Sequence, residues 1–292
     1  MVERLGECYL IVQRPPDRSR CSPHYRRKGP SKMKPVMDII LSRKSIRAYE
    51  DRPIPDGIRD EILHAALRAP TAGNMMLYSV IHVSDQAAKE TLARTCDNQP
   101  FIARAPLVLL FLADYQRWYD YFVLTDVERL CTQRGEPLLK PEEGDLFLAC
   151  CDALIAAHTA VIAAESVGIG SCYIGDIMEN YEVHRDLFKL PRYVFPICLV
   201  CFGYPTKQQM ERPLTSRFGR EFIVFENQYR ALDRGEFEAM FRPMMNEMAK
   251  DGPKPGGIEN PGQMMYFRKF SAGFSKEMRR SVRVMLRSWS QG

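Results

Sequence analysis

The chain has 292 residues, 46% of them hydrophobic and 26% charged, which is the composition of a globular protein with one large core or two modest ones. A formal net charge of +5 is too small to indicate nucleic-acid binding by itself. Nine cysteines, an odd number lying mostly in apolar stretches, predict a reducing, cytoplasmic setting without structural disulfides.

Residues 1–34 differ in composition from the rest of the chain. They are strongly basic, lack the apolar core of a signal peptide, and contain four prolines that prevent regular structure, at Pro15, Pro16, Pro23 and Pro30. Two interpretations stay open. The segment is a disordered extension or translated upstream sequence, or it is a basic arm for nucleic acid or an acidic partner.

The first half of the folded part reads as alternating helices and strands. Val36, Ile39, Ile40 and Leu41 predict the apolar face of a short helix, and a basic run at 42–47 follows it. The remaining predicted elements are an extended segment at 48–55, a helix from 56 to about 69, a loop at 70–74, a strand at 78–83, a helix at 86–96 and a strand at 106–113.

The middle of the chain contains its longest apolar stretch. Residues 115–144 predict a helical excursion whose aromatic residues either cover a pocket or simply pack. Residues 146–167 predict one long helix buried on most sides, because they are rich in Ala and Leu and free of Gly and Pro. It would be the central helix of a core formed by one chain or shared between two subunits. Asp152, His158 and Glu165 argue against a membrane span. A glycine-rich loop is expected after this helix.

The last part of the chain has three predicted elements: a helix at 183–187, a strand at 194–202 and a basic amphipathic helix at 275–289. Strands separated by helices indicate an α+β layered fold. We divide the chain into a basic extension (1–34), a core (35–218) and a C-terminal helical extension (219–292). The extension is expected to wrap the core or a partner subunit.

The basic run at 42–47 is the first candidate for chemistry. Arg43, Ser45 and Arg47 alternate, so in an extended segment they share one face and offer a phosphate a fork of donors and a hydroxyl. A solvated charged face is the alternative interpretation.

Three motifs in order resemble the nitroreductase family of flavin enzymes. They are the Arg-x-Ser-x-Arg run at 43–47, the small-residue loop Pro-Thr-Ala-Gly-Asn at 70–74, and the glycine-containing segment at 163–175 that ends the long helix. The resemblance covers residues 35–218. It implies a three-layer fold with a mainly antiparallel sheet around a long buried central helix.

The resemblance also implies an FMN site. Arg43 and Ser45, with Lys44 between them, would bind the FMN phosphate, and Arg47 would lie near flavin N1 and O2. The loop expected to meet the ring and ribityl chain, often from the second subunit, consists of Pro70, Thr71, Ala72, Gly73 and Asn74. Tyr173, Ile174 and Gly175 would place backbone near N5. Arg212 would return to the phosphate, with Lys207 and Arg217 as alternatives.

The chain departs from the family pattern in three places. Met76-Leu77 stand where Gln-Pro is common, His158 where the central helix often has Gln, and Leu214 where a second cation is expected. The first two bear on the substrate, and the third bears on the contact with the phosphate.

The function implied is that of a homodimeric FMN-dependent oxidoreductase. It would take hydride from NADPH or NADH and reduce a small acceptor such as a nitroaromatic or quinone by a ping-pong mechanism. No side-chain acid or base is required, so no catalytic residue is named. The alternatives are another reaction in the same fold (dehalogenation, ring dehydrogenation or flavin fragmentation) and a nucleic-acid or acidic-partner binding protein. Neither nucleic acid nor membrane is an expected partner.

Two further patterns are assigned to the core. Cys198 and Cys201 have redox-motif spacing but fall in a predicted strand, where residues three apart face opposite sides. His158, on a predicted buried helix, is interpreted as a core histidine rather than a base. The histidines lack metal-ligand spacing, so no metal site is expected.

Overall fold

The structure, a computed structural model, describes residues 36–250, 252 and 255–290, so the predicted extension at 1–34 lies outside the described residues. Its centre is an antiparallel four-stranded sheet with the strand order β1-β2-β4-β3. The strands are β1 (Tyr78–His82), β2 (Leu107–Asp114), β3 (Gly170–Ile174) and β4 (Val194–Gly203).

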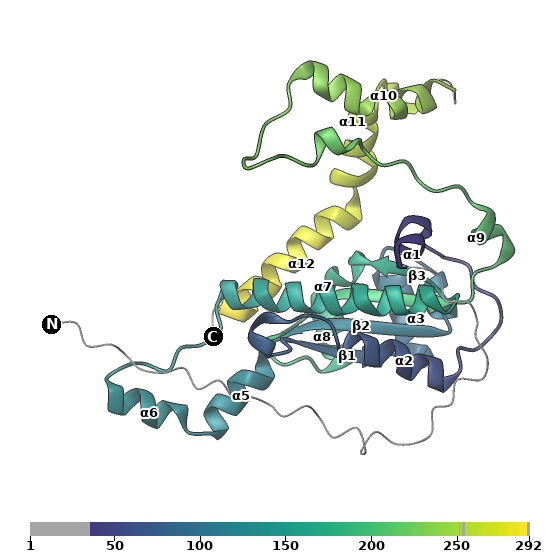
Figure 1. Ribbon diagram of the computed structural model, residues 1–292. Helices are drawn as coiled ribbons and strands as arrows, with labels where there is room; N and C mark the ends of the chain where they lie inside the picture. The colour runs from purple at the N-terminus through teal and green to yellow at the C-terminus, as the bar shows by residue number, and fades with distance from the viewer. Residues whose placement is uncertain (1–35, 251, 253–254, 291–292) are drawn as a thin grey trace. The chain divides into compact units, whose positions relative to one another are not determined.

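Helices cover both faces of this sheet (Figure 1). All eight residues of β2 are buried, and its side chains alternate between two hydrophobic clusters. Leu109 and Phe111 pack with α2 (Asp56–Ala66) and α7 (Glu143–Ser166) on one face. Val108 and Leu110 pack with α3 (Gln86–Thr95) and α4 (Phe101–Arg104) on the other. The predicted three-layer α+β fold is therefore confirmed.

The predicted central helix is α7, which begins at a capping box formed by Glu142 and Asp145. Within the described part of the chain, α7 alone has the length and hydropathy of a membrane span, yet it packs in the core. Only 44% of its most apolar stretch is buried, and Phe147 is 70% exposed. Burial on most sides was therefore a wrong prediction for a single chain, because small Ala residues face the sheet while larger apolar ones face outward.

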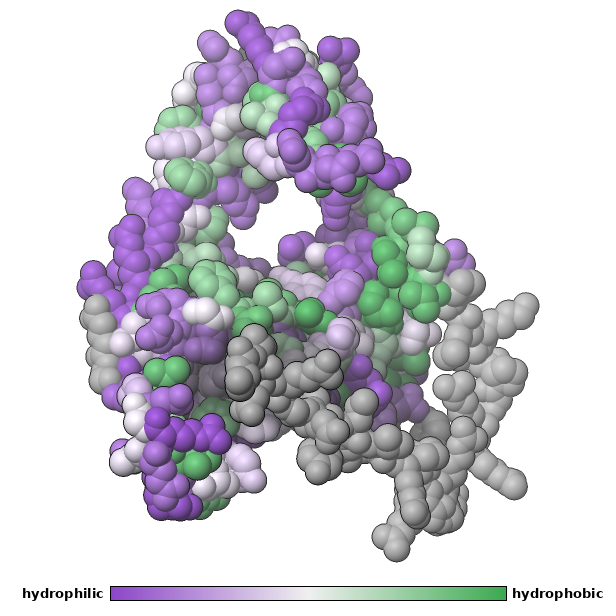
Figure 2. Space-filling model, turned by 60° about the vertical axis from the view of Figure 1, so that its left-hand side comes forward, coloured by the Kyte–Doolittle hydropathy of each residue, from purple (hydrophilic) through white to green (hydrophobic). Residues whose placement is uncertain are grey.

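The first helix, α1 (Val36–Ser42), shows the same outward apolar face. Only Ile39 is buried, whereas Val36, Met37, Ile40 and Leu41 are all exposed. Hydrophobic patches interrupt the polar surface of the molecule in Figure 2. The predicted short helix is formed, and its exposed apolar face is a surface without a partner in one chain.

The segment after α7 is a strand where the sequence predicts a glycine-rich loop. Gly168 ends the helix with φ of 81°, and β3 begins two residues later. Gly170 lies opposite Gly203 in the β3–β4 ladder. A Cβ at Gly170 would lie 2.5 Å from Ile46 Cγ1, so this glycine is where segment 45–49 packs onto the sheet. Glycine normally weakens a strand, which is why the sequence pattern is misleading here.

Further helices flank the sheet and complete the C-terminal part. They are α5 (Gln116–Leu124), α6 (Val127–Arg134), α8 (Tyr181–Phe188), α9 (Lys207–Glu211), α10 (Arg234–Lys250), α11 (Pro261–Met265) and α12 (Gly273–Ser290). No residue of α10 is buried, but α12 returns to the core. Its Trp289 is buried and donates from Nε1 to the Glu142 carbonyl at 3.0 Å. The last helix thus wraps the core as expected.

Candidate functional site

The basic run lies along the outer edge of β3. Ser45 forms a parallel bridge with Ser171, and the Ile46 N–H donates to the Ser171 carbonyl at 2.8 Å. Ile46 is buried, whereas Ser45 is partly buried and Arg47 is exposed. The Arg43 N–H still donates to the Ile39 carbonyl of α1 at 2.9 Å, so the extended segment begins after Arg43. The shared face of Arg43, Ser45 and Arg47 therefore stays a prediction.

A cation from the far end of the core joins this run. Arg212 donates from Nη2 to the Ser45 carbonyl at 2.8 Å. Lys44 Nζ in turn donates to the carbonyls of Met210, at 2.7 Å, and Arg212, which ties the run to the segment that follows α9. Among the three late cations, Arg212 is the one that contacts the run.

The two alternatives to Arg212 make local contacts instead. Lys207 Nζ lies 3.7 Å from a Glu211 carboxylate oxygen, and Arg217 donates to the Thr215 hydroxyl at 3.0 Å. The structure therefore favours Arg212 as the late cation of the candidate site.

The cationic groups act electrostatically on one buried thiol. Burial raises the pKa of the Cys172 thiol, and Arg47, Ser45, Arg43 and Arg212 all act to lower it. Arg43 Nη1 is buried and has no hydrogen-bond partner among the described residues. A buried guanidinium donor without a partner is costly, so this atom marks a place for an anionic acceptor.

The third predicted region begins where β3 ends. Ile174 is buried, while Gly175 is exposed and has no heavy atom within 4 Å of the position that a Cβ would take. The backbone at Gly175 therefore faces open space. Tyr173 is partly buried, and its hydroxyl lies 3.3 Å from His158 Nδ1. His158 itself is exposed, so its assignment to the core was wrong.

The loop at 70–74 lies at the other end of the sheet. It leads into β1 at Tyr78, which is paired with Ala113, whereas Ser45 is linked through Ser171 and Phe202 to Leu107. At about 3.3 Å per residue, these ends of β2 are roughly 20 Å apart. One chain thus brings the cations and Gly175 to one edge of the sheet but places Gly73 and Asn74 elsewhere.

The predicted excursion at 115–144 contains α5 and α6. Trp118 is partly buried against the core and donates from Nε1 to the Met75 carbonyl at 2.7 Å, so α5 is tied to the residue that follows the 70–74 loop. Tyr121 and Leu124 are exposed. The inner aromatic residues therefore pack, and the outer side chains remain available to cover a neighbouring surface.

Sequence reasoning missed two buried carboxyl groups next to these segments, Asp152 and Glu179. Both lie in otherwise apolar or mixed stretches, where a single acidic residue carries no recognisable spacing. Glu179 ends the turn that starts at Gly175, and its Oε1 has no partner among the described residues. Burial, followed by the neighbouring Asp176 carboxylate, raises the pKa of Glu179 to about 8.

This raised pKa predicts a stability that falls as pH rises. In the unfolded chain the Glu179 carboxyl releases its proton near the ordinary value of 4.5, while the folded chain retains it to about 8. The unfolding free energy should therefore drop across this window, by at most about 5 kcal/mol. Urea unfolding at a series of pH values should show this slope, and Glu179→Gln should flatten it. An unchanged slope in the variant would assign the effect to other groups.

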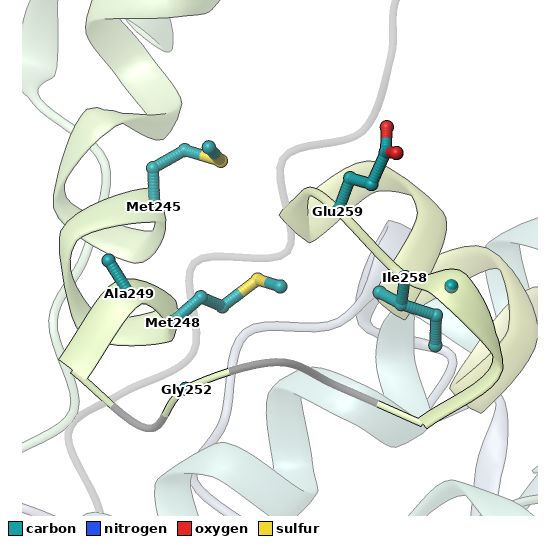
Figure 3. A pocket seen from close by; sticks show the side chains of 7 residues that line it. Met245, Met248, Ala249, Gly252, Ile258 and Glu259 are labelled. Carbon is teal, nitrogen blue, oxygen red and sulfur yellow. The ribbon is translucent and has the colours of Figure 1, made fainter.

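Three cavities in the described part of the chain lie away from these residues. The one in Figure 3 has a volume of about 380 Å³, and Met245 and Met248 of α10 project toward the segment that carries Ile258. None of the cations at 43–47 lines any of the three.

Comparison with known proteins identifies a family. Residues 40–204 match the family model "Nitroreductase family". The chain is 31% identical over 201 residues to an oxygen-insensitive NADPH nitroreductase of Salmonella typhimurium, covering 69% of this chain and 77% of the relative. It is 32% identical over 197 residues to an FMN reductase [NAD(P)H] of Bacillus subtilis, covering 68% of this chain and 75% of the relative.

Solved structures agree with this match. The structure of B. megaterium NfrA2 has a TM-score of 0.73 and 26% identity, covering 87% of this chain and 97% of that one. The NADPH:FMN oxidoreductase of Vibrio harveyi, solved with NAD+, shares the fold with a TM-score of 0.69 at 23% identity, covering 86% of this chain and 97% of that one. The chain belongs to the nitroreductase family.

Proposed function

We propose that the protein is an FMN-dependent oxidoreductase that takes hydride from NADPH or NADH and reduces a small acceptor such as a nitroaromatic or a quinone. The observation that carries the proposal is that the basic run at 43–47, joined by Arg212, lies along edge strand β3, which ends at the open backbone of Gly175. The names of the relatives, a nitroreductase and an FMN reductase, support the same activity.

The residues present fit FMN at both ends of the site. Arg43 Nη1 lacks an acceptor, and a phosphate oxygen would supply one to a planar guanidinium donor. Gly175 presents backbone without a side chain, so a flat ring can approach closely. Arg43, Ser45 and Arg212 would hold the phosphate, and the carbonyls that bind Lys44 hold this segment in place.

FMN, when bound, supplies the hydride chemistry, and the protein binds and orients it. Arg47 would provide positive charge near the ring and so favour the reduced, anionic cofactor. The exposed backbone at Gly175 would leave room for the nicotinamide and then for the acceptor. No ionisable side chain needs to transfer a proton, so the site needs no catalytic acid or base.

The complete site is proposed to need two chains. The loop at 70–74 lies about 20 Å from the cations of its own chain, measured along the strands. The exposed apolar faces of α1 and α7 offer a surface for a second copy. A homodimer would cover these faces and bring the loop of one chain to the cations of the other. The proposed location of the protein is the cytoplasm.

Mixed dimers test this arrangement. Arg43→Ala removes a cation and Gly73→Val distorts the loop, and each homodimer should lose FMN. If sites form between chains, co-expression of the two variants should restore one intact site in each mixed dimer, measured as bound flavin per purified heterodimer. Mixed dimers without flavin would show that each chain builds its own site.

Anaerobic titration tests the activity itself. The purified chain loaded with FMN should be yellow and should be bleached by NADPH, NADH or both, then recover its colour with a nitroaromatic or quinone. A dehalogenase, ring dehydrogenase or flavin-fragmenting enzyme need not accept hydride from a nicotinamide. A protein that takes up no FMN would overturn the proposal, and an FMN protein that neither nicotinamide reduces would favour those alternatives.

A further inference from the structure

A buried carboxylate of α7 binds the predicted flavin loop at both of its ends. Asp152 is 3% exposed and lies on the face of α7 that packs into the fold. Its Oδ1 accepts from the Ala72 N–H at 3.0 Å. Its Oδ2 accepts from the Leu77 N–H, also at 3.0 Å, and from the Thr71 hydroxyl. A carboxylate suits this place because an ionised Asp only accepts hydrogen bonds.

The Thr71 hydroxyl extends this contact to a further residue. While it donates to Asp152, it accepts from the Met76 N–H at 2.8 Å. The two ends of the loop are therefore joined through one side chain of α7. The loop between them is strained, because Asn74 and Met76 have φ of 58° and 51°, values that side chains other than Gly adopt at a cost.

We infer that Asp152 is a positioning residue that sets the conformation of the loop at 70–76 and, through it, the affinity for the flavin ring. This inference rests on the proposed function, since that proposal assigns the ring and ribityl chain to the loop. Within its own chain Asp152 contacts the loop and not the cations, because Glu165, whose carboxylate lies 3.3 Å from the Ser171 hydroxyl, is about 20 Å further along α7. Since the loop is assigned to the ring and ribityl chain, Asp152 should act on that end of the cofactor.

Comparing the affinities for FMN and for riboflavin, which lacks the phosphate, shows which end of the cofactor a substitution affects. Asp152→Asn places an amide N–H₂ group, itself a donor, among the three groups that donate to Asp152. The dissociation constants of FMN and of riboflavin should both rise by the same factor, about tenfold. It should also shift the visible circular dichroism of bound FMN, which reports how the ring is held. Glu61→Gln, which changes an exposed carboxyl of α2, is the matched control and should leave both constants unchanged.

Substitutions at Thr71 give the same test if Asp152→Asn fails to fold. Thr71→Ser keeps the hydroxyl and should keep both flavin affinities, while Thr71→Val should weaken both. Wild-type affinities and an unchanged circular dichroism spectrum in Asp152→Asn, or in Thr71→Val if the former does not fold, would overturn the inference even if the apoprotein is less stable. Wild-type protein that binds neither flavin would instead overturn the proposed function and leave the hydrogen bonds of Asp152 with a structural role.

Discussion

Arg43→Ala should weaken FMN binding about a hundredfold and leave riboflavin binding nearly unchanged, because a lost charge-assisted contact to phosphate is worth about 1.5–3 kcal/mol. The buried Nη1 of Arg43 has no hydrogen-bond partner among the described residues. Arg43→Ala therefore removes a donor for the phosphate without breaking a hydrogen bond of that atom within the protein. Dissociation constants from flavin fluorescence quenching of the apoprotein measure both effects.

Two sets of variants show whether this effect belongs to the site. Arg212→Ala should act in the same direction as Arg43→Ala, since Arg212 contacts the Ser45 carbonyl. Lys207→Ala, at a side chain that is 89% exposed, should have little effect on FMN binding. Equal losses of FMN and riboflavin in Arg43→Ala would contradict a phosphate contact, and a large loss in Lys207→Ala would assign the late cation differently.

Gly170→Ala should disturb both stability and FMN binding, although it adds one methyl group and no charge. The new Cβ would meet Ile46 Cγ1 at 2.5 Å and Ile46 Cβ at 3.0 Å. Ile46 is β-branched and cannot rotate away freely, so segment 45–47 has to shift and carry Ser45 and Arg47 with it. Overpacking of this kind costs about 1–3 kcal/mol, and FMN affinity should fall about tenfold.

Urea unfolding and flavin titration of the same preparation measure the two effects of Gly170→Ala. Gly203→Ala should behave similarly, because its Cβ would lie 2.5 Å from the Tyr49 ring. Gly57→Ala is the control, since no atom lies within 4 Å of its added Cβ and alanine favours a helix. If Gly170→Ala unfolds like the wild type and binds FMN equally well, Ile46 does not fix the cation segment.

The fold was predictable where one physical signal dominated. The continuous apolar runs of β2 and β4 and the Ala-rich α7 fixed three central elements, because burial on both faces leaves no polar alternation. The strand at Gly170 was not predictable in this way, since its glycine is explained by the close approach of Ile46, which is distant in sequence. The outward faces of α1 and α7 likewise depend on surfaces outside one chain.

The candidate site, like the fold, has parts that the local sequence predicts and parts that it does not. The extended conformation at 45–47 was predictable because it needs only local information, whereas the Arg43 N–H still bonds to Ile39 at the end of α1. The choice of Arg212 over Lys207 and Arg217 depended on where α9 ends, and no local pattern encodes that. Asp152 served in the sequence only as an argument against a membrane span, whereas its three donors lie in a segment about 80 positions earlier in the chain.

The distance between the loop and the cations has a consequence for handling the enzyme. If half of each flavin pocket comes from another molecule, retention of the yellow colour depends on how concentrated the protein is. Dilution that separates subunits would release FMN from otherwise folded chains, and added FMN would in turn hold dilute subunits together.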